Sequence, residues 1–351
     1  MTIPAVVLGA TGYVGGEILR LLETHPYFRL AAAVSDSRSG DAIADVFPNL
    51  AGTYTGILLE HPNAWLKKID KGADLALFSA APHGASAPII ATALEGAADR
   101  DLVVHVVDSS ADFRYASAKQ YEAIYGVPHP VPHLISSFFC AVPEHAPVVD
   151  ALHAGHPGCF ATAILLAAVP LLKSGLTNNE FFVNAITGST GSGRNPQAGT
   201  HHPERHNNLY AYNPLSHRHV PEIEALIQNV CQIKTNVHFV PHSGPFTRGI
   251  YVTLQAKMNS LMSTDEIQEV FRSFYENSEF VSVVDGEPRL KDVIASNNAR
   301  IGVTCEGDTV VVMNAIDNLI KGAAGGALQW MNRLWLLPES TGLTTASAAW
   351  L

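Results

Sequence analysis

The chain has 351 residues, of which 47% are hydrophobic and 15% charged, and this balance excludes an intrinsically disordered protein. At about 150 residues per domain, the length predicts two domains. The formal net charge is −10 at pH 7 with no basic run, which argues against binding to nucleic acid.

The sequence also argues against a membrane or secreted protein. Its most apolar stretch, residues 161–172, is too short to span a bilayer. The first residues have no basic leader of the kind that signal peptides carry. The four cysteines, Cys140, Cys159, Cys231 and Cys305, are irregularly spaced, which favours a reducing compartment over a disulfide framework. We therefore expect a cytoplasmic protein.

The first third of the chain alternates apolar strands with helices. The predicted strands are residues 3–8, 30–34, 75–79 and 102–107, and the predicted helices are residues 13–22 and 85–94. Nearly continuous apolar strands separated by helices are typical of a parallel sheet that is covered on both faces. The sequence thus predicts an α/β domain that opens with a βαβ unit.

A Pro- and His-rich region at residues 115–147 is the predicted domain border. Beyond it we expect helices at 160–173, 221–231 and 264–276 (with Thr264 as N-cap), and strands at 181–186, 237–240, 250–256 and 309–313. This pattern predicts an α+β domain at residues 156–316. A glycine-containing helix from 317 to 332 is expected to return to the first domain, so that residues 317–351 complete the domain at 1–155.

A glycine-rich turn follows the first strand and opens the first helix. It reads Gly9-Ala10-Thr11-Gly12-Tyr13-Val14-Gly15. In a Rossmann-type domain, glycines here allow a tight turn and a close approach of the backbone to a pyrophosphate, which the helix N-terminus binds. The spacing is a variant of the usual G-x-G-x-x-G pattern. We therefore predict that the first domain binds a dinucleotide.

The end of the second strand bears on which dinucleotide binds. An acidic residue there favours the ribose hydroxyls of NAD, whereas Arg and hydroxyl groups favour the 2′-phosphate of NADP. The segment Ser35-Asp36-Ser37-Arg38 has both. The two serines and the arginine are possible ligands of the 2′-phosphate, whereas Asp36 would repel it. This balance favours NADP but does not exclude NAD.

Cys159 lies in the segment His156-Pro157-Gly158-Cys159-Phe160, at the start of a predicted buried helix. A thiol at a helix N-terminus is expected to have a lowered pKa, which populates the nucleophilic thiolate. The other three cysteines have no Pro-Gly turn before them and fit inert core positions. Cys159 is the predicted nucleophile.

Two further segments carry candidate site residues. Residues 188–194, Gly-Ser-Thr-Gly-Ser-Gly-Arg, could bind an anion or a flat ring through the backbone. Residues 201–222 are rich in histidine but lack the ligand spacing of a known metal site, so no metal is predicted. His219 lies next to a predicted helix start at Pro221, and an imidazole suits proton transfer to and from a thiol.

Taken together, six blocks resemble the N-acetyl-γ-glutamyl-phosphate reductase family, which is related to aspartate-semialdehyde dehydrogenase. The blocks begin at Gly9, Ser110, Ala141, Pro157, His217 and Ala315, and they follow the family's order over nearly the whole chain. The resemblance implies the NADPH-dependent step of arginine biosynthesis and a homo-oligomer, as a dimer or homotetramer. It also implies that the α+β domain at residues 156–316 serves catalysis and dimerisation. Three positions depart from the family pattern: His156, Ala161 and the segment Asp108-Ser109-Ser110.

The resemblance also implies roles for single residues. Cys159 would be the nucleophile and His219 the acid/base, while Ser35 and Arg38 would lie near the 2′-phosphate. Arg114 is the candidate ligand for the substrate phosphate, and Arg218 is a second predicted substrate residue. The cofactor phosphates would be bound by Gly9, Thr11, Gly12, Tyr13, Val14 and Gly15. The nicotinamide would lie near Gly188, Ser189, Gly191, Gly193 and Asn318.

The expected reaction begins with attack of the Cys159 thiolate on a small-molecule acyl phosphate. Phosphate leaves, the resulting thioester accepts a hydride from NADPH, and a semialdehyde is released. One alternative is the related reductase of carrier-linked aminoadipyl phosphate in lysine biosynthesis, which the segment His201-His-Pro-Glu-Arg205 resembles. A non-catalytic NADP sensor is another, but it would need neither the thiol nor the imidazole.

Overall fold

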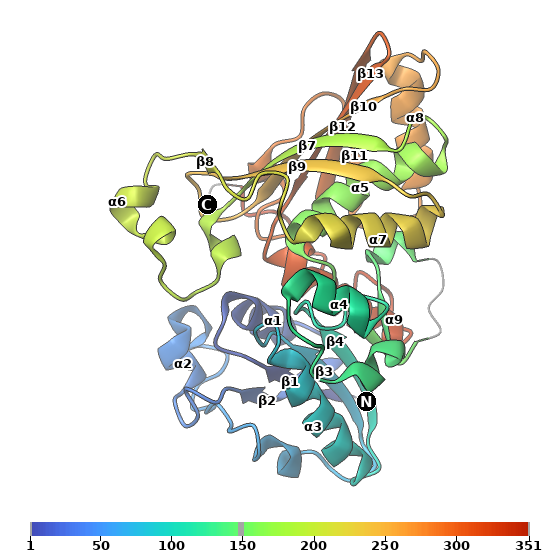
Figure 1. Ribbon diagram of the computed structural model, residues 1–351. Coiled ribbons are helices and arrows are strands. Elements are labelled where there is room, and N and C mark those ends of the chain that lie inside the picture. The colour runs from blue at the N-terminus through green and yellow to red at the C-terminus, as the bar shows by residue number, and fades with distance from the viewer. Residues whose placement is uncertain (1, 147–150, 350–351) are drawn as a thin grey trace. The chain divides into compact units, whose positions relative to one another are not determined.

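The computed structural model describes residues 2–146 and 151–349, and in this part of the chain the fold forms two compact units. The first unit comprises residues 2–140, 151–156 and 324–343. The second comprises residues 141–146, 157–323 and 344–349. Both units are therefore built from segments that are far apart in the sequence, as the colours of Figure 1 show.

The first unit is a six-stranded parallel sheet with strand order β2-β1-β3-β4-β6-β5. Its strands are β1 (Ile3–Leu8), β2 (Phe28–Val34), β3 (Asp74–Ser79), β4 (Val103–Asp108), β5 (Phe138–Cys140) and β6 (His153–Gly155). Its helices are α1 (Tyr13–Glu23), α2 (Ile43–Val46), α3 (Ser86–Ala98), α4 (Ala118–Tyr125) and α9 (Gly325–Leu334), with short 3-10 helices at η1 (Pro48–Leu50), η2 (Trp65–Lys68) and η3 (Pro132–Ser137). The central strands β1 and β3 are almost entirely buried, which agrees with their unbroken apolar sequences.

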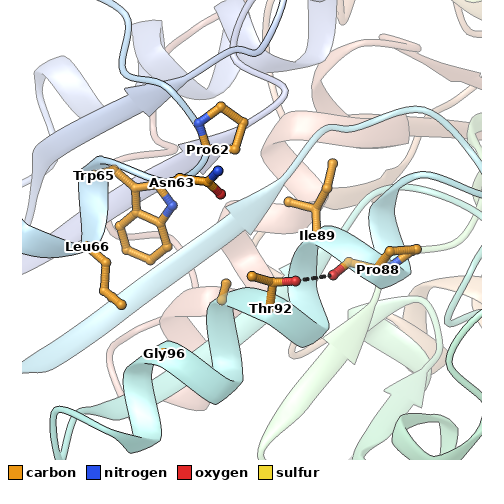
Figure 2. A pocket seen from close by; sticks show the side chains of 9 residues that line it. Pro62, Asn63, Trp65, Leu66, Pro88, Ile89, Thr92 and Gly96 are labelled. Atoms are coloured by element: carbon orange, nitrogen blue, oxygen red, sulfur yellow. Dashed lines mark hydrogen bonds between the residues drawn. The ribbon is translucent and has the colours of Figure 1, made fainter.

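A pocket of about 390 Å³ opens within the first unit between η2 and α3. Figure 2 shows Trp65 and Leu66 on one side, and Ile89 and Thr92 of α3 on the other. The close packing of η2 on this helix requires Gly96, because a Cβ there would lie 2.6 Å from the Leu66 side chain. None of the predicted site residues lines this pocket.

The second unit is a seven-stranded mixed sheet with strand order β11-β12-β13-β10-β7-β9-β8. Its strands are β7 (Glu180–Thr187), β8 (Tyr210–Ala211), β9 (Asn236–Ser243), β10 (Ile250–Lys257), β11 (Val281–Val283), β12 (Ala299–Glu306) and β13 (Thr309–Ile316). Its helices are α5 (Cys159–Lys173), α6 (His202–Arg205), α7 (His219–Cys231) and α8 (Thr264–Phe274), with 3-10 helices at η4 (Pro143–His145), η5 (Ser189–Ser192), η6 (Ala198–Thr200) and η7 (Leu290–Asp292). Helix α5 is apolar on all sides and buried from Phe160 to Leu172.

The predicted fold class is confirmed: a Rossmann-type parallel sheet is joined to an α+β unit. Several boundaries differ from prediction. The N-cap of α8 is Ser263, not Thr264, because its hydroxyl accepts a hydrogen bond from Glu266 N and forms a capping box. The predicted border at 115–147 contains α4 and β5, and the chain leaves the first unit only after residue 140.

The helix predicted at 317–332 is wrong in its first part. The segment Ile320–Ala324 is a π-helical turn, and α9 begins at Gly325. The Asp317 carboxylate accepts hydrogen bonds from Leu319 N at 2.8 Å and Ile320 N at 3.0 Å, and Gly322 N donates to Asp317 O at 3.0 Å. The hydrogen bond from Gly322 N to the carbonyl oxygen five residues earlier is the pattern of a π-helix. Residues 317–323 and 344–349 lie in the second unit, whereas the sequence assigned them to the first.

Candidate active site

The glycine turn in the first unit has the geometry that a dinucleotide phosphate requires. Gly9 has φ +68°, and a Cβ there would lie 2.7 Å from the backbone of Ala80. A Cβ at Gly15 would lie 2.7 Å from the backbone of Ala10. With Gly12 as N-cap, helix α1 begins at Tyr13, directly after the turn. The turn therefore holds the backbone close to a helix N-terminus, where phosphate oxygens bind.

Ser35 and Arg38 follow β2, next to this turn. The hydroxyl groups of Thr11 and Ser35 lie 3.5 Å apart, which places the ends of β1 and β2 together. Arg38 Nε donates to Asp41 at 2.6 Å, and the His61 ring lies 3.6 Å from the exposed Asp36 carboxylate. Val14, the remaining predicted phosphate residue, lies in the first turn of α1.

Arg114 is buried in the first unit, and its guanidinium binds main-chain oxygens. Its Nε donates to His156 O at 2.9 Å and its Nη2 to Ser109 O at 2.8 Å. Nearby, the Asp108 carboxylate accepts hydrogen bonds from the hydroxyls of Ser86 and Ser110. Burial raises the pKa of Asp108 to about 6, although these hydrogen bonds lower it. The segment 108–110, which departs from the pattern of the family that the chain resembles, thus forms a buried polar network beside Arg114.

In the second unit, Cys159 is the first residue of α5, with Gly158 as N-cap. The backbone N–H of Gly158 donates to the buried Glu222 carboxylate at 2.7 Å. On another side, Gly322 of the π-turn packs against the cysteine: a Cβ at Gly322 would lie 2.7 Å from Cys159 Cβ. Helix α7 therefore holds the residue before Cys159, and the π-turn packs against Cys159 itself, at the N-terminus of α5.

His219 begins α7, so the helix starts two residues earlier than predicted. Its ring centroid lies 6.2 Å from that of Phe160, the residue after Cys159, and 4.7 Å from that of His217. His217 Nδ1 accepts a hydrogen bond from His219 N at 3.2 Å. Burial, followed by the charge of Arg218, lowers the pKa of His217 to about 4. The structure thus brings His219 to the start of the Cys159 helix beside a neutral His217.

The predicted nicotinamide residues also form a connected group in the second unit. Gly188, Ser189, Gly191 and Gly193 lie in and around η5, and Gly193 has φ +82°. Asn318 Nδ2 donates to the hydroxyl of Thr190 at 3.0 Å, and its Oδ1 accepts from Gly249 N at 2.7 Å. Asn318 therefore joins this loop to the end of β13. Arg218, the second predicted substrate residue, is exposed at the N-cap of α7.

Sequence reasoning missed Glu222 and Gly322. Helical spacing offered a signal for Glu222, since residues i and i+3 share a helix face and Glu222 is three residues after His219. A small residue was expected at Gly322 for close packing, but its neighbour Cys159 could not be foreseen. Within residues 2–146 and 151–349, no group of three or more His, Cys, Asp or Glu side chains could hold a metal.

Two family models match the chain and together cover most of it. Residues 4–138 match the NAD binding domain of semialdehyde dehydrogenase, and residues 159–318 match its dimerisation domain. N-acetyl-γ-glutamyl-phosphate reductases from Acetivibrio thermocellus and Pelotomaculum thermopropionicum are 36% and 37% identical to the chain. These alignments cover 96% and 98% of the chain, and 97% and 98% of the relatives.

The chain belongs to the N-acetyl-γ-glutamyl-phosphate reductase family. Among solved structures, aspartate semialdehyde dehydrogenase with NADP from Candida albicans is similar, with a TM-score of 0.70 at 16% identity over 96% of this chain and 99% of that chain. The Vibrio cholerae aspartate semialdehyde dehydrogenase II has a TM-score of 0.68 at 15% identity, over 96% and 98% of the two chains. At such identities the likeness concerns the fold.

The first unit of this family member is thus a dinucleotide-binding domain, and the second contains a dimerisation domain, which indicates homo-oligomers. In the part of the chain that the structure describes, no helix has the length and apolar character to cross a bilayer.

Proposed function

We propose that this chain catalyses the NADPH-dependent reduction of N-acetyl-γ-glutamyl phosphate to N-acetylglutamate 5-semialdehyde and phosphate, a step of arginine biosynthesis. The observation that carries the proposal is Cys159 at the N-terminus of α5, packed against Gly322 and next to the helix that begins with His219. Relatives of this name align with nearly the full chain, which supports the same substrate.

In the first step the Cys159 thiolate attacks the acyl carbon. A C–S bond forms, the C–O bond to phosphate breaks, and phosphate leaves with the electron pair. Backbone N–H groups at the start of α5 are suited to stabilise the oxyanion of the tetrahedral intermediate. The product is a thioester on Cys159.

When held by the glycine turn, NADPH would supply the hydride that reduces this thioester. The resulting hemithioacetal collapses to the semialdehyde, and the thiolate of Cys159 is restored. His219 is assigned to the proton transfers at the thiol and at the substrate oxygen, because an imidazole can both accept and donate a proton. His217, which is buried, is assigned to positioning the start of α7.

The glycine turn fits the dinucleotide, since a Cβ at Gly9 or Gly15 would occupy space that the backbone needs. We assign the cofactor phosphates to Gly9, Thr11, Gly12, Tyr13, Val14 and Gly15. Ser35 and Arg38 are assigned to the 2′-phosphate, which makes NADP the preferred cofactor. The loop 188–193 and Asn318 are assigned to the nicotinamide, and Arg114 and Arg218 to the substrate.

We further propose a homotetramer in the cytoplasm. The dimerisation-domain match supports assembly. The four cysteines form no disulfide in the described part of the chain, which fits a reducing compartment. Light scattering would report four chain masses if this assembly is correct and two if the protein stops at a dimer.

The reverse reaction tests the proposed function. Purified protein is mixed with NADP, phosphate and N-acetylglutamate semialdehyde, and NADPH formation is followed by absorbance; the aminoadipate analogue is assayed in parallel. We expect turnover with the first aldehyde, and no turnover in Cys159→Ala with NADPH binding retained. Turnover with only the analogue would support the lysine-type enzyme, and none with either aldehyde would refute the proposal.

A further inference from the structure

Arg205 is a buried cation whose hydrogen bonds are incomplete. It ends α6 in the second unit and is 8% exposed. Its Nη2 donates to the carbonyl oxygen of Gly244. Within the described residues, its Nε and Nη1 are covered from solvent but have no hydrogen-bond partner, and the guanidinium has no carboxylate within ion-pair distance. A guanidinium has five N–H donors, so most of its donors are unused.

A buried charge without a partner is strongly unfavourable, and an unsatisfied buried donor in a native structure calls for a missing partner. For a guanidinium, the fitting partner is a carboxylate or phosphate oxygen. The nearby His242 adds a second unsatisfied group, since its Nδ1 is also buried without a partner in the described part of the chain. His242 lies in β9, two residues before Gly244, whose carbonyl oxygen accepts the Arg205 hydrogen bond.

The surroundings of Arg205 and His242 are connected to the proposed active site through β8 and the segment that follows it. Ala211 pairs with His242 of β9, and Tyr212 N donates to Pro241 O at 3.1 Å. The Tyr212 ring lies 5.7 Å from the His217 ring, which packs 5.5 Å from Phe160. Burial raises the pKa of Tyr212, and the charge of Cys159 raises it further while Arg218 and Arg205 lower it. Tyr212 thus lies within electrostatic reach of both the thiol and Arg205.

We propose that Arg205 is a substrate-binding residue that pairs with an anionic oxygen group of the substrate, either its carboxylate or its phosphoryl group. The inference rests on the proposed function, because that substrate carries both groups. It assigns a role to a residue outside the predicted site.

The local structure permits such binding. The helical hydrogen bonds of the segment that carries Arg205 are internal: Arg205 N donates to His201 O at 3.0 Å and His206 N to His202 O at 2.9 Å. Helix α6 has only four residues, and Figure 1 shows it on the side of the sheet that ends with the edge strand β8. Because these hydrogen bonds lie within the segment, a movement of α6 on substrate binding would leave them intact.

The reverse reaction separates the two possible anions, because the carboxylate then belongs to the semialdehyde and the phosphoryl group enters as inorganic phosphate. The variants are R205Q, R205K and, as the matched control, R272Q, which removes an arginine from the half-exposed surface of α8. In R205Q we expect the KM of one of these two substrates to rise about 10- to 100-fold, as expected for loss of a hydrogen bond to a charged group. The KM of NADP should be the same in R205Q as in R272Q.

A raised KM for the semialdehyde assigns Arg205 to the carboxylate, and a raised KM for phosphate assigns it to the phosphoryl group. Both KM values unchanged relative to R272Q would overturn the inference, as would a change of oligomeric state alone. If R205Q does not fold, R205K decides, since it keeps the charge but loses the planar fork and should show the same selective KM change. An R205K with unchanged KM values would overturn the inference.

A binding test keeps this inference separate from the proposed function. Inorganic phosphate and N-acetylglutamate are added in turn to the wild type, R205K and R272Q, and the melting temperature is measured. One of the two anions should stabilise the wild type and R272Q but not R205K, even if the wild type turns over neither aldehyde. Equal stabilisation of all three proteins, or of none, would overturn the role of Arg205 and leave the proposed function intact.

Discussion

The buried carboxylate of Glu222 accepts a 2.7 Å hydrogen bond from the backbone N–H of Gly158, the residue that precedes Cys159. The helix that carries His219 thereby fixes the start of the helix that carries the thiol. We expect Glu222→Ala to leave this buried N–H without its acceptor, which costs about 1–3 kcal/mol of stability. Displacement of the thiol should lower kcat by at least about 10-fold. Glu222→Gln keeps an acceptor oxygen and serves as the control. Equal kcat values for the two variants would show that the acceptor does not position Cys159.

Gly322 leaves no room for a side chain beside Cys159. Because a Cβ would lie 2.7 Å from Cys159 Cβ, we expect Gly322→Ala to push the thiol away from the reacting carbon. A displacement of this order can lower kcat by about 100-fold. The control is Gly52→Ala, because a Cβ at Gly52 would meet open space. Steady-state kinetics and the rate of Cys159 alkylation measure the effect, and wild-type values of both in Gly322→Ala would contradict it.

Arg38 should discriminate between the two nicotinamide cofactors. Its guanidinium already binds Asp41, which holds the side chain in place after β2. In Arg38→Gln, loss of a charged hydrogen bond to the 2′-phosphate should raise the KM of NADP by about 10- to 100-fold. The KM of NAD, which lacks that phosphate, should change little. Arg29→Gln, an exposed position on β2, is the control. An equal rise for both cofactors would rule out contact with the 2′-phosphate.

His145 makes the stability of the second unit depend on pH. Burial lowers its pKa from 6.5 to about 4, and its Nε2 hydrogen-bonds the Tyr275 hydroxyl at 3.0 Å. Between pH 6.5 and 4 the unfolded chain therefore binds a proton at this residue that the folded protein does not. The contribution of neutral His145 is fully present above pH 6.5 and is lost as the pH falls toward 4.

This loss amounts to at most about 1.4 kcal/mol of unfolding free energy per pH unit. The measurement is chemical denaturation of the wild type and His145→Gln from pH 4 to 8. The difference between the two curves should be constant above pH 7 and change steadily below pH 6.5. Parallel curves over the whole range would show that His145 does not titrate in this way.

The features that sequence could predict are those whose chemistry is local. The turn at Gly9–Gly15 and the Pro157-Gly158-Cys159 start of α5 each lie within seven consecutive residues, so backbone freedom and a helix terminus can be inferred from neighbours. The Gly158–Glu222 hydrogen bond joins residues 64 positions apart, and the Cys159–Gly322 contact spans more than twice that separation. Such pairs depend on tertiary packing, which periodicity in one segment does not contain.

The same reasoning explains the errors at 299–306 and 317–324. Strand β12 was missed because Gly302, Thr304 and Cys305 interrupt its apolar pattern, and it is stabilised by pairing with β11 and β13. The π-turn was read as α-helix because its residues suit both forms. In the structure the Asp317 carboxylate caps this turn and also pairs with Arg248 at 3.0 Å, a residue far from it in the sequence.

Helix α9 is the last element of a unit whose other strands and helices come from the first 156 residues. It packs on β4 with Trp330 and Met331 fully buried, and its Asn332 binds His25 at 3.0 Å. During translation, residues 324–343 leave the ribosome only after the whole intervening unit has been made. The packing of α9 on β4 can therefore form only after the second unit has been synthesised, so the first unit is completed last although its strands are made first.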